Sequence, residues 1–345
     1  MRLVLPAAVI FSMLSLGAVA ADGPKPLFAS DEVLNITISG PMDNIPREVG
    51  AKPVPGVLKV NGAAPESLPV ALTVRSTTRR RRDVCAFPPL RVEFPQKPGP
   101  ASIFKGQKRL KLVTHCQRLA SFQNYVLLEY AAYRLYNALT PESFKVRLLK
   151  INYTGEDGKP LYDRVGIFIE DVDDVAKRNG QERLRGVHQI NVSQLDPAAA
   201  ARYAVFQYMI SNLDWAMTVG AAGEDCCHNA RLAATNGATT GLIPLPYDFD
   251  YGGLVNPPYA VPPDSIKLAN VRVRRWRGFC AHNEEAKAFM AQISARRAEL
   301  IGIVNQTPGL EDRPRQTADA YLGEFFDEIA SPAKVADFMK MCLRS

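Results

Sequence analysis

Two carboxylates that follow an apolar run are the residues of this chain best suited to chemistry. In the stretch G-L-I-P-L-P-Y-D-F-D-Y-G-G these are Asp248 and Asp250, and two glycines stand behind them. Asp214 lies earlier, after an amphipathic run, and His228 and Asn229 open a short strand-like piece between the two stretches. Magnesium takes few protein oxygens and leaves its other positions to water and phosphate. The pattern therefore favours a magnesium–phosphate site, and phosphoryl transfer as its reaction.

Positively charged residues that could face such phosphates lie in the first half of the chain. Lys111 lies in an alternating strand-like run, 108–115, whose apolar neighbours indicate a half-buried strand. A buried charge is costly without a partner, so we expect Lys111 to meet a ligand or a counter-ion. Glu129 lies inside the apolar stripe of a helix over 121–140 and should also be paired. The arginine run 79–82 is either a solvated turn or a loop over phosphate groups, whose oxygens match the arginine fork.

The elements that would carry these residues change in kind along the chain. Alternating, strand-like runs dominate the first half, at residues 34–38, 56–60, 68–75, 90–94, 108–115, 144–153 and 164–169. Helical runs are expected at 121–140, 197–212, 284–304, 317–330 and 333–343. We therefore expect an irregular N-terminal extension over 21–55, a β-rich part with one long helix over 56–172, and a helical part over 173–345.

The composition is that of an ordinary globular protein. The chain has 345 residues, of which 47% are hydrophobic and 22% charged, enough for one bilobal unit or two domains. Its net charge of +7 slightly favours anionic ligands. The arginine run has no interleaved aromatic residues, so we do not expect a nucleic-acid partner.

The first residues predict the compartment. Arg2 provides a short positive region, residues 3–16 are apolar, and residues 18–20 read A-V-A, as at a signal-peptidase site. Residues 1–20 are therefore predicted to be a secretory signal peptide. No other run approaches the roughly 20 apolar residues that a transmembrane helix needs. We expect an exported protein, periplasmic or extracellular, without a transmembrane segment.

Six cysteines in an exported chain indicate disulfides. Zinc is less favoured, because the sequence has no C-x-x-C pair. Cys85 and Cys116 lie on neighbouring strand-like segments and are the first expected bridge. A bridge from Cys226 or Cys227 to Cys280 is the second.

The order of these parts resembles the CotH-like family of exported proteins, which has an atypical protein-kinase-like fold. The likeness is clearest in V-R-S-T-T-R-R-R-R-D-V-C-A-F-P-P-L, L-K-L-V-T-H-C, Y-V-L-L-E-Y-A-A-Y-R-L-Y-N, F-I-E-D and P-Y-D-F-D, and it extends from about residue 55 to 278. The resemblance implies an α+β, bilobal fold with a β-rich N-lobe and a mainly helical C-lobe. ATP and Mg²⁺ would bind between the lobes, and the phosphate acceptor would be a protein or a small molecule.

The resemblance also implies roles for particular residues of the first half. Lys111 would hold the α- and β-phosphates, and Glu129 would be its ion-pair partner on the long helix. Glu170 and Asp171 would lie at the hinge beside the nucleotide. The sequence lacks a G-x-G-x-x-G loop, so cradling of the phosphates would fall to the arginine run, with Arg80 as a phosphate-binding residue.

In the second half, the resemblance implies that Asp214 occupies the position of the catalytic carboxylate, which accepts a proton from the acceptor hydroxyl or orients it. Asn229, Asp248 and Asp250 would hold the metal. No H-R-D triplet precedes Asn229, so Asp225 or His228 could take the role of Asp214 instead.

Other functional classes stay open at this point. An inactive, pseudokinase-like protein that binds a nucleotide without transfer is the main alternative, and a disulfide-stapled envelope protein that binds calcium is another. The regular D-x-D-x-D-G calcium loop is missing, however. A serine hydrolase is disfavoured, since the chain has no G-x-S-x-G elbow.

Overall fold

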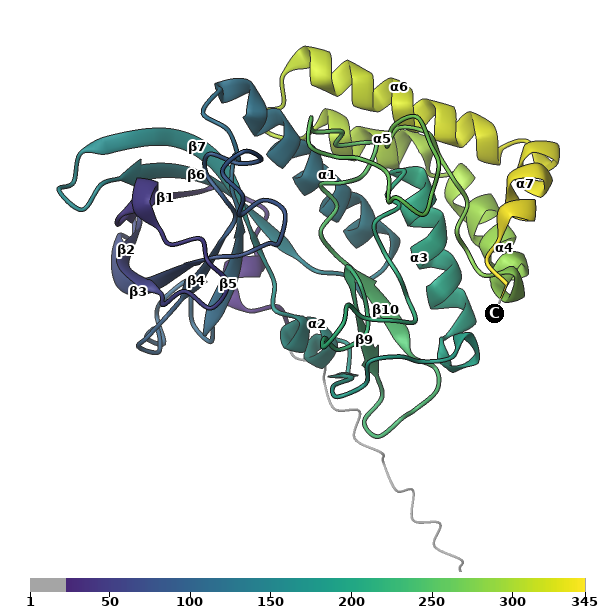
Figure 1. The fold of residues 1–345 in the computed structure, drawn as a ribbon, viewed down its shortest axis with the longest axis horizontal. Coiled ribbons are helices and arrows are strands. Elements are labelled where there is room, and N and C mark those ends of the chain that lie inside the picture. The colour runs from purple at the N-terminus through teal and green to yellow at the C-terminus, as the bar shows by residue number, and fades with distance from the viewer. Residues whose placement is uncertain (1–22, 345) are drawn as a thin grey trace, which may run out of the picture.

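Seven strands from the first half of the chain close into a β-barrel, and most of the helices pack together on one side of it (Figure 1). The structure is a computed structural model that describes residues 23–344. The barrel strands are β1 (Leu34–Ser39), β2 (Val54–Val60), β3 (Glu66–Val74), β4 (Leu90–Glu93), β5 (Arg109–Val113), β6 (Val146–Thr154) and β7 (Pro160–Ile169). Their order is β1-β2-β3-β4-β5-β7-β6, and β6 closes the barrel by pairing in parallel with β1.

Alternation along each strand decides which side chains fill the barrel. In β5, Leu110 and Leu112 are buried in the barrel core together with Leu72, Val92 and other apolar residues of the same cluster. Lys111 lies between the two leucines and faces outward, because successive side chains of a strand point to opposite faces. The alternation of the side chains thus places Lys111 on the outer face of the barrel, toward the rest of the molecule.

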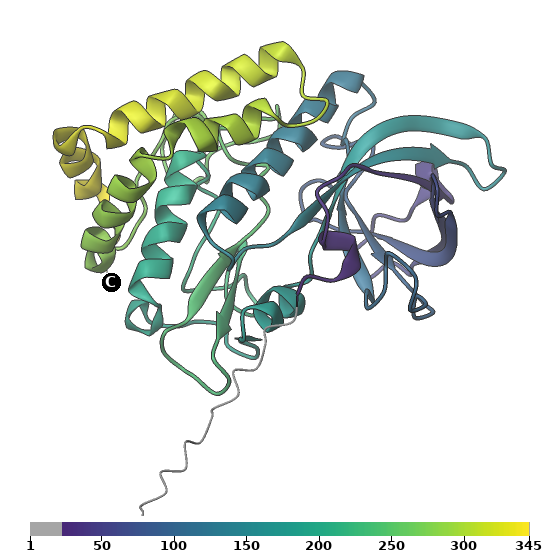
Figure 2. The same cartoon turned by 180° about the vertical axis from the view of Figure 1, so that it is seen from behind.

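A second hydrophobic core lies among the helices. These are α1 (Gln123–Leu139), α2 (Val172–Arg178), α3 (Pro197–Met209), α4 (Asn283–Ser294), α5 (Arg297–Asn305), α6 (Asp312–Ile329) and α7 (Pro332–Phe338). Short 3-10 helices occupy Pro26–Phe28, Met42–Asn44, Ala120–Phe122, Val192–Gln194, Cys280–His282 and Met339–Met341. The buried face of α1 belongs to this second core, and Figures 1 and 2 show α1 between the barrel and the other helices.

A small antiparallel sheet accompanies the helices of the second half. Its order is β10-β9-β8, from β8 (Glu182–Arg183), β9 (Ala230–Ala234) and β10 (Ile243–Pro246). Ala230 pairs with Pro246 at one end of the β9–β10 pair. Residues that precede β9 and residues that follow β10 therefore meet at that end.

The expected bilobal, protein-kinase-like fold with a β-rich N-lobe and a mainly helical C-lobe is wrong. The strands form a closed, mixed seven-stranded barrel instead, accompanied by seven α-helices and a second sheet in the described residues 23–344. The physical reason lies in β1, a strand-like run that was expected to belong to an N-terminal extension outside the β-rich part. Leu34, Ile36 and Ile38 present one buried face, and the strand pairs with both β2 and β6, so the sheet keeps no free edge there.

Three disulfides join the six cysteines. The expected Cys85–Cys116 bridge is confirmed, whereas the expected bridge from Cys226 or Cys227 to Cys280 is wrong. The actual bridges are Cys226–Cys227 and Cys280–Cys342. The chain around Cys280 pairs with the C-terminal segment, since its N–H donates to the carbonyl of Leu343 at 2.9 Å, and this contact brings Cys342 to it.

The predicted signal peptide, residues 1–20, lies outside the described residues. Within residues 23–344, none of the helices combines the length and the apolar character that crossing a bilayer requires.

Candidate functional site

Three carboxylates from distant parts of the chain meet beside α1. Glu129 lies in the middle of that helix, and Asp248 and Asp250 lie in the loop that follows β10. One oxygen from each lies within 4.8 Å of the others, close enough for a single metal ion to bind all three. Glu129 is only 1% exposed, and its Oε1 has no hydrogen-bond partner. A buried, unpartnered carboxylate oxygen beside two more carboxylates is an arrangement that a cation would complete.

The loop that carries the two aspartates is fixed by contacts on both sides. Tyr133, one helical turn beyond Glu129, accepts a hydrogen bond from the N–H of Asp248 at 2.9 Å. Phe249 is fully buried, with its ring 4.5 Å from that of Tyr133 and 5.2 Å from that of Phe206. Asp248 has a φ of 64°, a left-handed conformation that Asp and Asn adopt more readily than most residues. The apolar residue in the D-F-D sequence is thus the anchor that turns both carboxylates toward α1.

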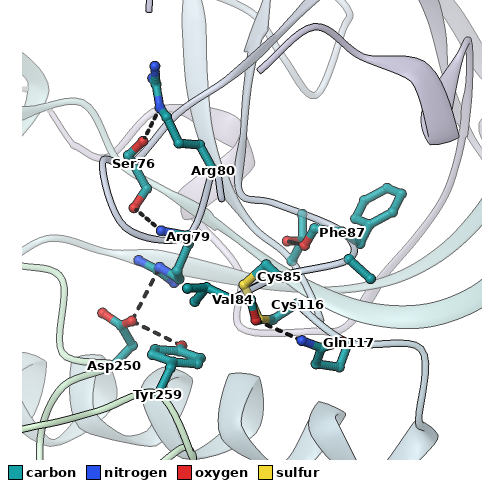
Figure 3. Close-up of a disulfide and its surroundings, with 12 residues drawn as sticks. Ser76, Arg79, Arg80, Val84, Cys85, Phe87, Cys116, Gln117, Asp250 and Tyr259 are labelled. Atoms are coloured by element: carbon teal, nitrogen blue, oxygen red, sulfur yellow. Dashed lines mark hydrogen bonds and ion pairs between the residues drawn. A yellow bond between two sulfur atoms is a disulfide. The ribbon is translucent and has the colours of Figure 1, made fainter. Parts of the chain in front are cut away.

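Arg79 is the cation that contacts this acidic cluster (Glu129, Asp248 and Asp250). Its guanidinium lies 2.7 Å from Oδ1 of Asp248 and 3.2 Å from Oδ2 of Asp250, as the dashed line to Asp250 in Figure 3 shows. Arg79 is 3% exposed, and the hydroxyl of Tyr259 donates to the same Oδ2 of Asp250 at 3.0 Å. Arg80, the residue expected to bind phosphate, turns away and donates to the carbonyl of Ser76 at 2.6 Å. The arginine run therefore presents Arg79 to the site rather than Arg80.

Lys111 lies close to the acidic cluster without an ion pair of its own in the described part of the chain. Its Nζ lies 4.1 Å from the centre of the Tyr247 ring, and the guanidinium of Arg231 lies 5.1 Å from the same ring. The expected ion pair between Lys111 and Glu129 is not formed. Burial, together with the charges of Arg75 and Arg231, lowers the pKa of Lys111 to about 7. A second cation near this point, Arg75, has a buried Nη1 with no hydrogen-bond partner.

The three carboxylates differ in how readily they ionise. Burial and the neighbouring Asp250 and Asp248 raise the pKa of Glu129 well above its ordinary value. Burial also raises the pKa of Asp250 to about 6. Burial opposes ionisation of Asp248 as well, but Arg79, Arg75 and Lys111 outweigh it and hold the pKa of that carboxyl below its usual value. The cluster is therefore short of positive charge at Glu129 and Asp250, where a bound cation would favour ionisation.

Asp214 forms its own small group at the end of the β9–β10 pair. One of its carboxylate oxygens is 2.8 Å from Nε2 of His228, and the other accepts from the amide of Asn229 at 2.9 Å. The N–H of Tyr247 donates to the carbonyl of Asn229 at 3.1 Å, which ties this group to the residue before Asp248. His228 and Asp214 are each partly exposed. The predicted metal role of Asn229 stays a prediction, since its amide is used here on Asp214.

Glu170 and Asp171, the residues expected beside a nucleotide, have structural partners in this molecule. Glu170 is buried, accepts the N–H of Lys145 at 2.9 Å and is 3.1 Å from Nε of Arg178. Asp171 caps the N-terminus of α2 by accepting the N–H of Asp173 at 3.0 Å. Asp171 also lines a cavity of about 760 Å³ between α2 and the outer face of β3 to β5.

Sequence reasoning missed several residues of the site. Tyr133, Tyr259 and Arg75 are not singled out by the sequence as site residues. For Tyr133 a signal was available, because positions four apart lie on the same face of a helix and Glu129 was already a candidate. The contact of Tyr259 with Asp250 depends on how the Pro-rich loop after Gly253 folds back, which has no periodic signal.

Comparison with known proteins adds little to this description. No protein-family model matches the sequence, and no curated protein matches it. A solved structure that does match is that of the Helicobacter pylori proinflammatory kinase CtkA, with 11% sequence identity, a TM-score of 0.37, and coverage of 73% of this chain and 89% of that one. A similarity this low assigns neither a family nor an activity to this chain, so functional assignment depends on the site itself.

Proposed function

We propose that this chain binds ATP complexed with Mg²⁺ and transfers the terminal phosphoryl group to a protein or small-molecule acceptor. The observation that carries the proposal is that three carboxylates share a single cation, Arg79, beside two cations that form no ion pair among the described residues. One oxygen of each carboxylate lies within 4.8 Å of the others, and the charges of Lys111 and Arg75 both act on Asp248, although neither cation forms an ion pair among the described residues. The carboxylates alone would suit a metal and the cations alone a phosphate. A metal–phosphate complex would offer a partner to both groups at once.

The acidic cluster fits magnesium by the chemistry of its donors. All three ligands are oxygens, which a hard divalent cation prefers, and Oε1 of Glu129 is a buried acceptor that otherwise has no partner. We assign Asp248, Asp250 and Glu129 as the residues that would hold the ion, in place of the expected role of Glu129 as a partner of Lys111. When bound, the ion would neutralise charge on the phosphate oxygens.

The remaining residues take the roles that their positions allow. Lys111 would contact the phosphates that are not transferred, and Arg75 would supply a second positive charge beside them. In the transfer step a bond forms between the acceptor oxygen and phosphorus, and the bond from phosphorus to the leaving diphosphate breaks. The proton of the acceptor hydroxyl would pass to Asp214, which His228 and Asn229 hold in place.

Replacement of Asp248 by asparagine tests the proposal. Asparagine keeps the size of the side chain and tolerates the positive φ, so the fold should survive while the charge is lost. We expect the rate of phosphate transfer from radiolabelled ATP to fall by about a hundredfold or more. Asp83→Asn, which removes an exposed carboxylate from the arginine run's own loop, is the matched control. Equal transfer rates in wild type and Asp248→Asn would contradict the assignment.

A second candidate function is nucleotide binding without transfer. It is favoured by one observation, the Arg79 guanidinium seated on two of the three carboxylates. Binding of Mg²⁺-ATP that depends on Lys111 and Asp248, with no labelled product from any acceptor, would support this alternative over the enzyme. Export of the protein belongs to the proposal too, since three disulfides suit an oxidising compartment.

A further inference from the structure

Arg79 already contacts the carboxylates that the proposed metal would need. Its side chain reaches Asp248 at 2.7 Å and Asp250 at 3.2 Å; the contact with Asp250 is buried, and the contact with Asp248 is partly buried. Buried interactions between charged groups are strong, and removing one partner leaves the other charge unpaired. Burial opposes the charge on Arg79, but Asp250 and Asp248 outweigh it and raise the pKa of the guanidinium, so Arg79 stays protonated at every accessible pH.

The loop that carries Arg79 is held in place at both ends. The N–H of Arg79 donates to Oγ of Ser76 at 3.2 Å. The Cys85–Cys116 disulfide ties the far side of the loop to the segment after β5 (Figure 3). Gln117 adds a hydrogen bond to the carbonyl of Val84 at 2.7 Å. The anchored backbone keeps the long arginine side chain within reach of the site, whichever group it contacts there.

A metal ion that arrived alone would have to compete with this guanidinium. The ion and Arg79 would bind the same carboxylates, and displacement of Arg79 would leave a buried positive charge without a partner. A metal that arrives with phosphate avoids this cost, because the phosphate oxygens offer the arginine fork a new anionic partner. The anchored loop means that the exchange needs a change of side-chain rotamer at Arg79, with no large movement of the backbone.

We infer that Arg79 exchanges partners when the site fills, from the carboxylates of Asp248 and Asp250 to the phosphate of the ligand. Arg79 is then the residue that makes the site select a metal–phosphate complex over a free metal ion. This inference rests on the proposed function and adds an order of binding to it. Its signature is a pair of opposite effects: loss of Arg79 strengthens the binding of metal alone and weakens the binding of metal with phosphate.

Isothermal titration of the mature protein with two probes tests the inference. One probe is Mg²⁺ alone, and the other is inorganic tripolyphosphate in the presence of Mg²⁺. For Arg79→Gln we expect affinity for Mg²⁺ alone to rise by about tenfold and affinity for the tripolyphosphate complex to fall by about tenfold. Arg79→Lys keeps the positive charge but loses the fork, so both changes should have the same signs and be smaller.

Arg82→Gln is the matched control, because it removes an exposed arginine from the same loop and should change neither affinity. Two affinities that move in the same direction in the Arg79 variants, or that do not move, would overturn the inference. Circular dichroism in the absence of metal reports whether Arg79→Gln folds, and if it does not, the two signs are decided with Arg79→Lys. Wild-type protein that fails to bind the tripolyphosphate complex would instead contradict the proposed function itself.

Discussion

Replacement of Glu129 by glutamine should leave the metal-free protein almost unchanged and remove much of its response to magnesium. The side chain is buried, and its oxygen lies within 4.8 Å of those of Asp248 and Asp250. At that separation two unit charges repel by about 3.5 kcal/mol at an effective dielectric constant of about 20. Burial and this repulsion raise the pKa of Glu129, so the metal-free protein favours the neutral acid, which glutamine imitates closely. We therefore expect the free energy of unfolding without metal to change by less than about 1 kcal/mol.

In the presence of magnesium, the free energies of unfolding of the wild type and Glu129→Gln should differ. A ligand present at about one hundred times its dissociation constant raises the free energy of unfolding by about 2.7 kcal/mol. Loss of one of three carboxylate ligands that weakens binding about tenfold would lower this gain by about 1.4 kcal/mol, to roughly half. The difference is therefore large enough to measure and appears only when metal is present.

Urea unfolding near neutral pH, with EDTA and with Mg²⁺, measures both quantities on the same samples. Glu299→Gln is a suitable control, since it removes an exposed carboxylate that pairs with Arg296 far from the site. A full magnesium response in Glu129→Gln would refute the metal role of Glu129. So would a loss of several kcal/mol in EDTA, because it would mean that the carboxylate is ionised and paired in the metal-free state.

Three further predictions concern Lys111, the Cys85–Cys116 disulfide and the pKa of Asp250. Lys111→Met should weaken binding of Mg²⁺-ATP by about tenfold in isothermal titration, because the phosphates lose one cation, while binding of Mg²⁺ alone persists. An unchanged affinity for Mg²⁺-ATP would exclude the proposed contact of Lys111 with the phosphates. Replacement of Cys85 and Cys116 by serine opens a loop closed over 31 residues and should lower the free energy of unfolding by about 3.7 kcal/mol in urea titrations. An unchanged free energy of unfolding would contradict this prediction. Burial raises the pKa of Asp250 to about 6, so between about pH 4 and pH 6 the folded metal-free protein holds a proton that the unfolded chain releases. The free energy of unfolding should therefore fall by about 2 kcal/mol as the pH rises from about 4 to about 6, and Asp250→Asn should remove that part of the pH dependence.

The strands and helices were the predictable part of the fold, because they depend on local periodicity. The alternating run around Lys111 and the apolar stripe around Glu129 placed both residues on the expected kind of element. Closure of the barrel was not predictable in the same way. It depends on the parallel pairing of β1 with β6, and their residues are more than one hundred positions apart in sequence, as with Leu34 and Leu149.

The candidate site was predictable in its residue types but not in its contacts. The sequence indicated carboxylates at Asp248 and Asp250 and a basic run before them. It could not show that Arg79 rather than Arg80 reaches them, because neighbouring arginines differ only in the direction that the turn gives them. Nor could it show that Glu129 faces the two aspartates and not Lys111, since that depends on the rotation of α1 about its axis.

Crystals soaked with Mn²⁺ and a non-hydrolysable ATP analogue offer the most direct test of the central claim, that carboxylates from both parts of the chain share one ion. Manganese prefers the same oxygen ligands as magnesium, and its anomalous scattering locates it without reference to the protein. We predict one anomalous peak in contact with Glu129, Asp248 and Asp250, with the analogue's phosphates between that peak and Lys111. A peak at another group of carboxylates, such as Asp171 and Asp173 beside α2, with no ion at the acidic cluster, would contradict the claim.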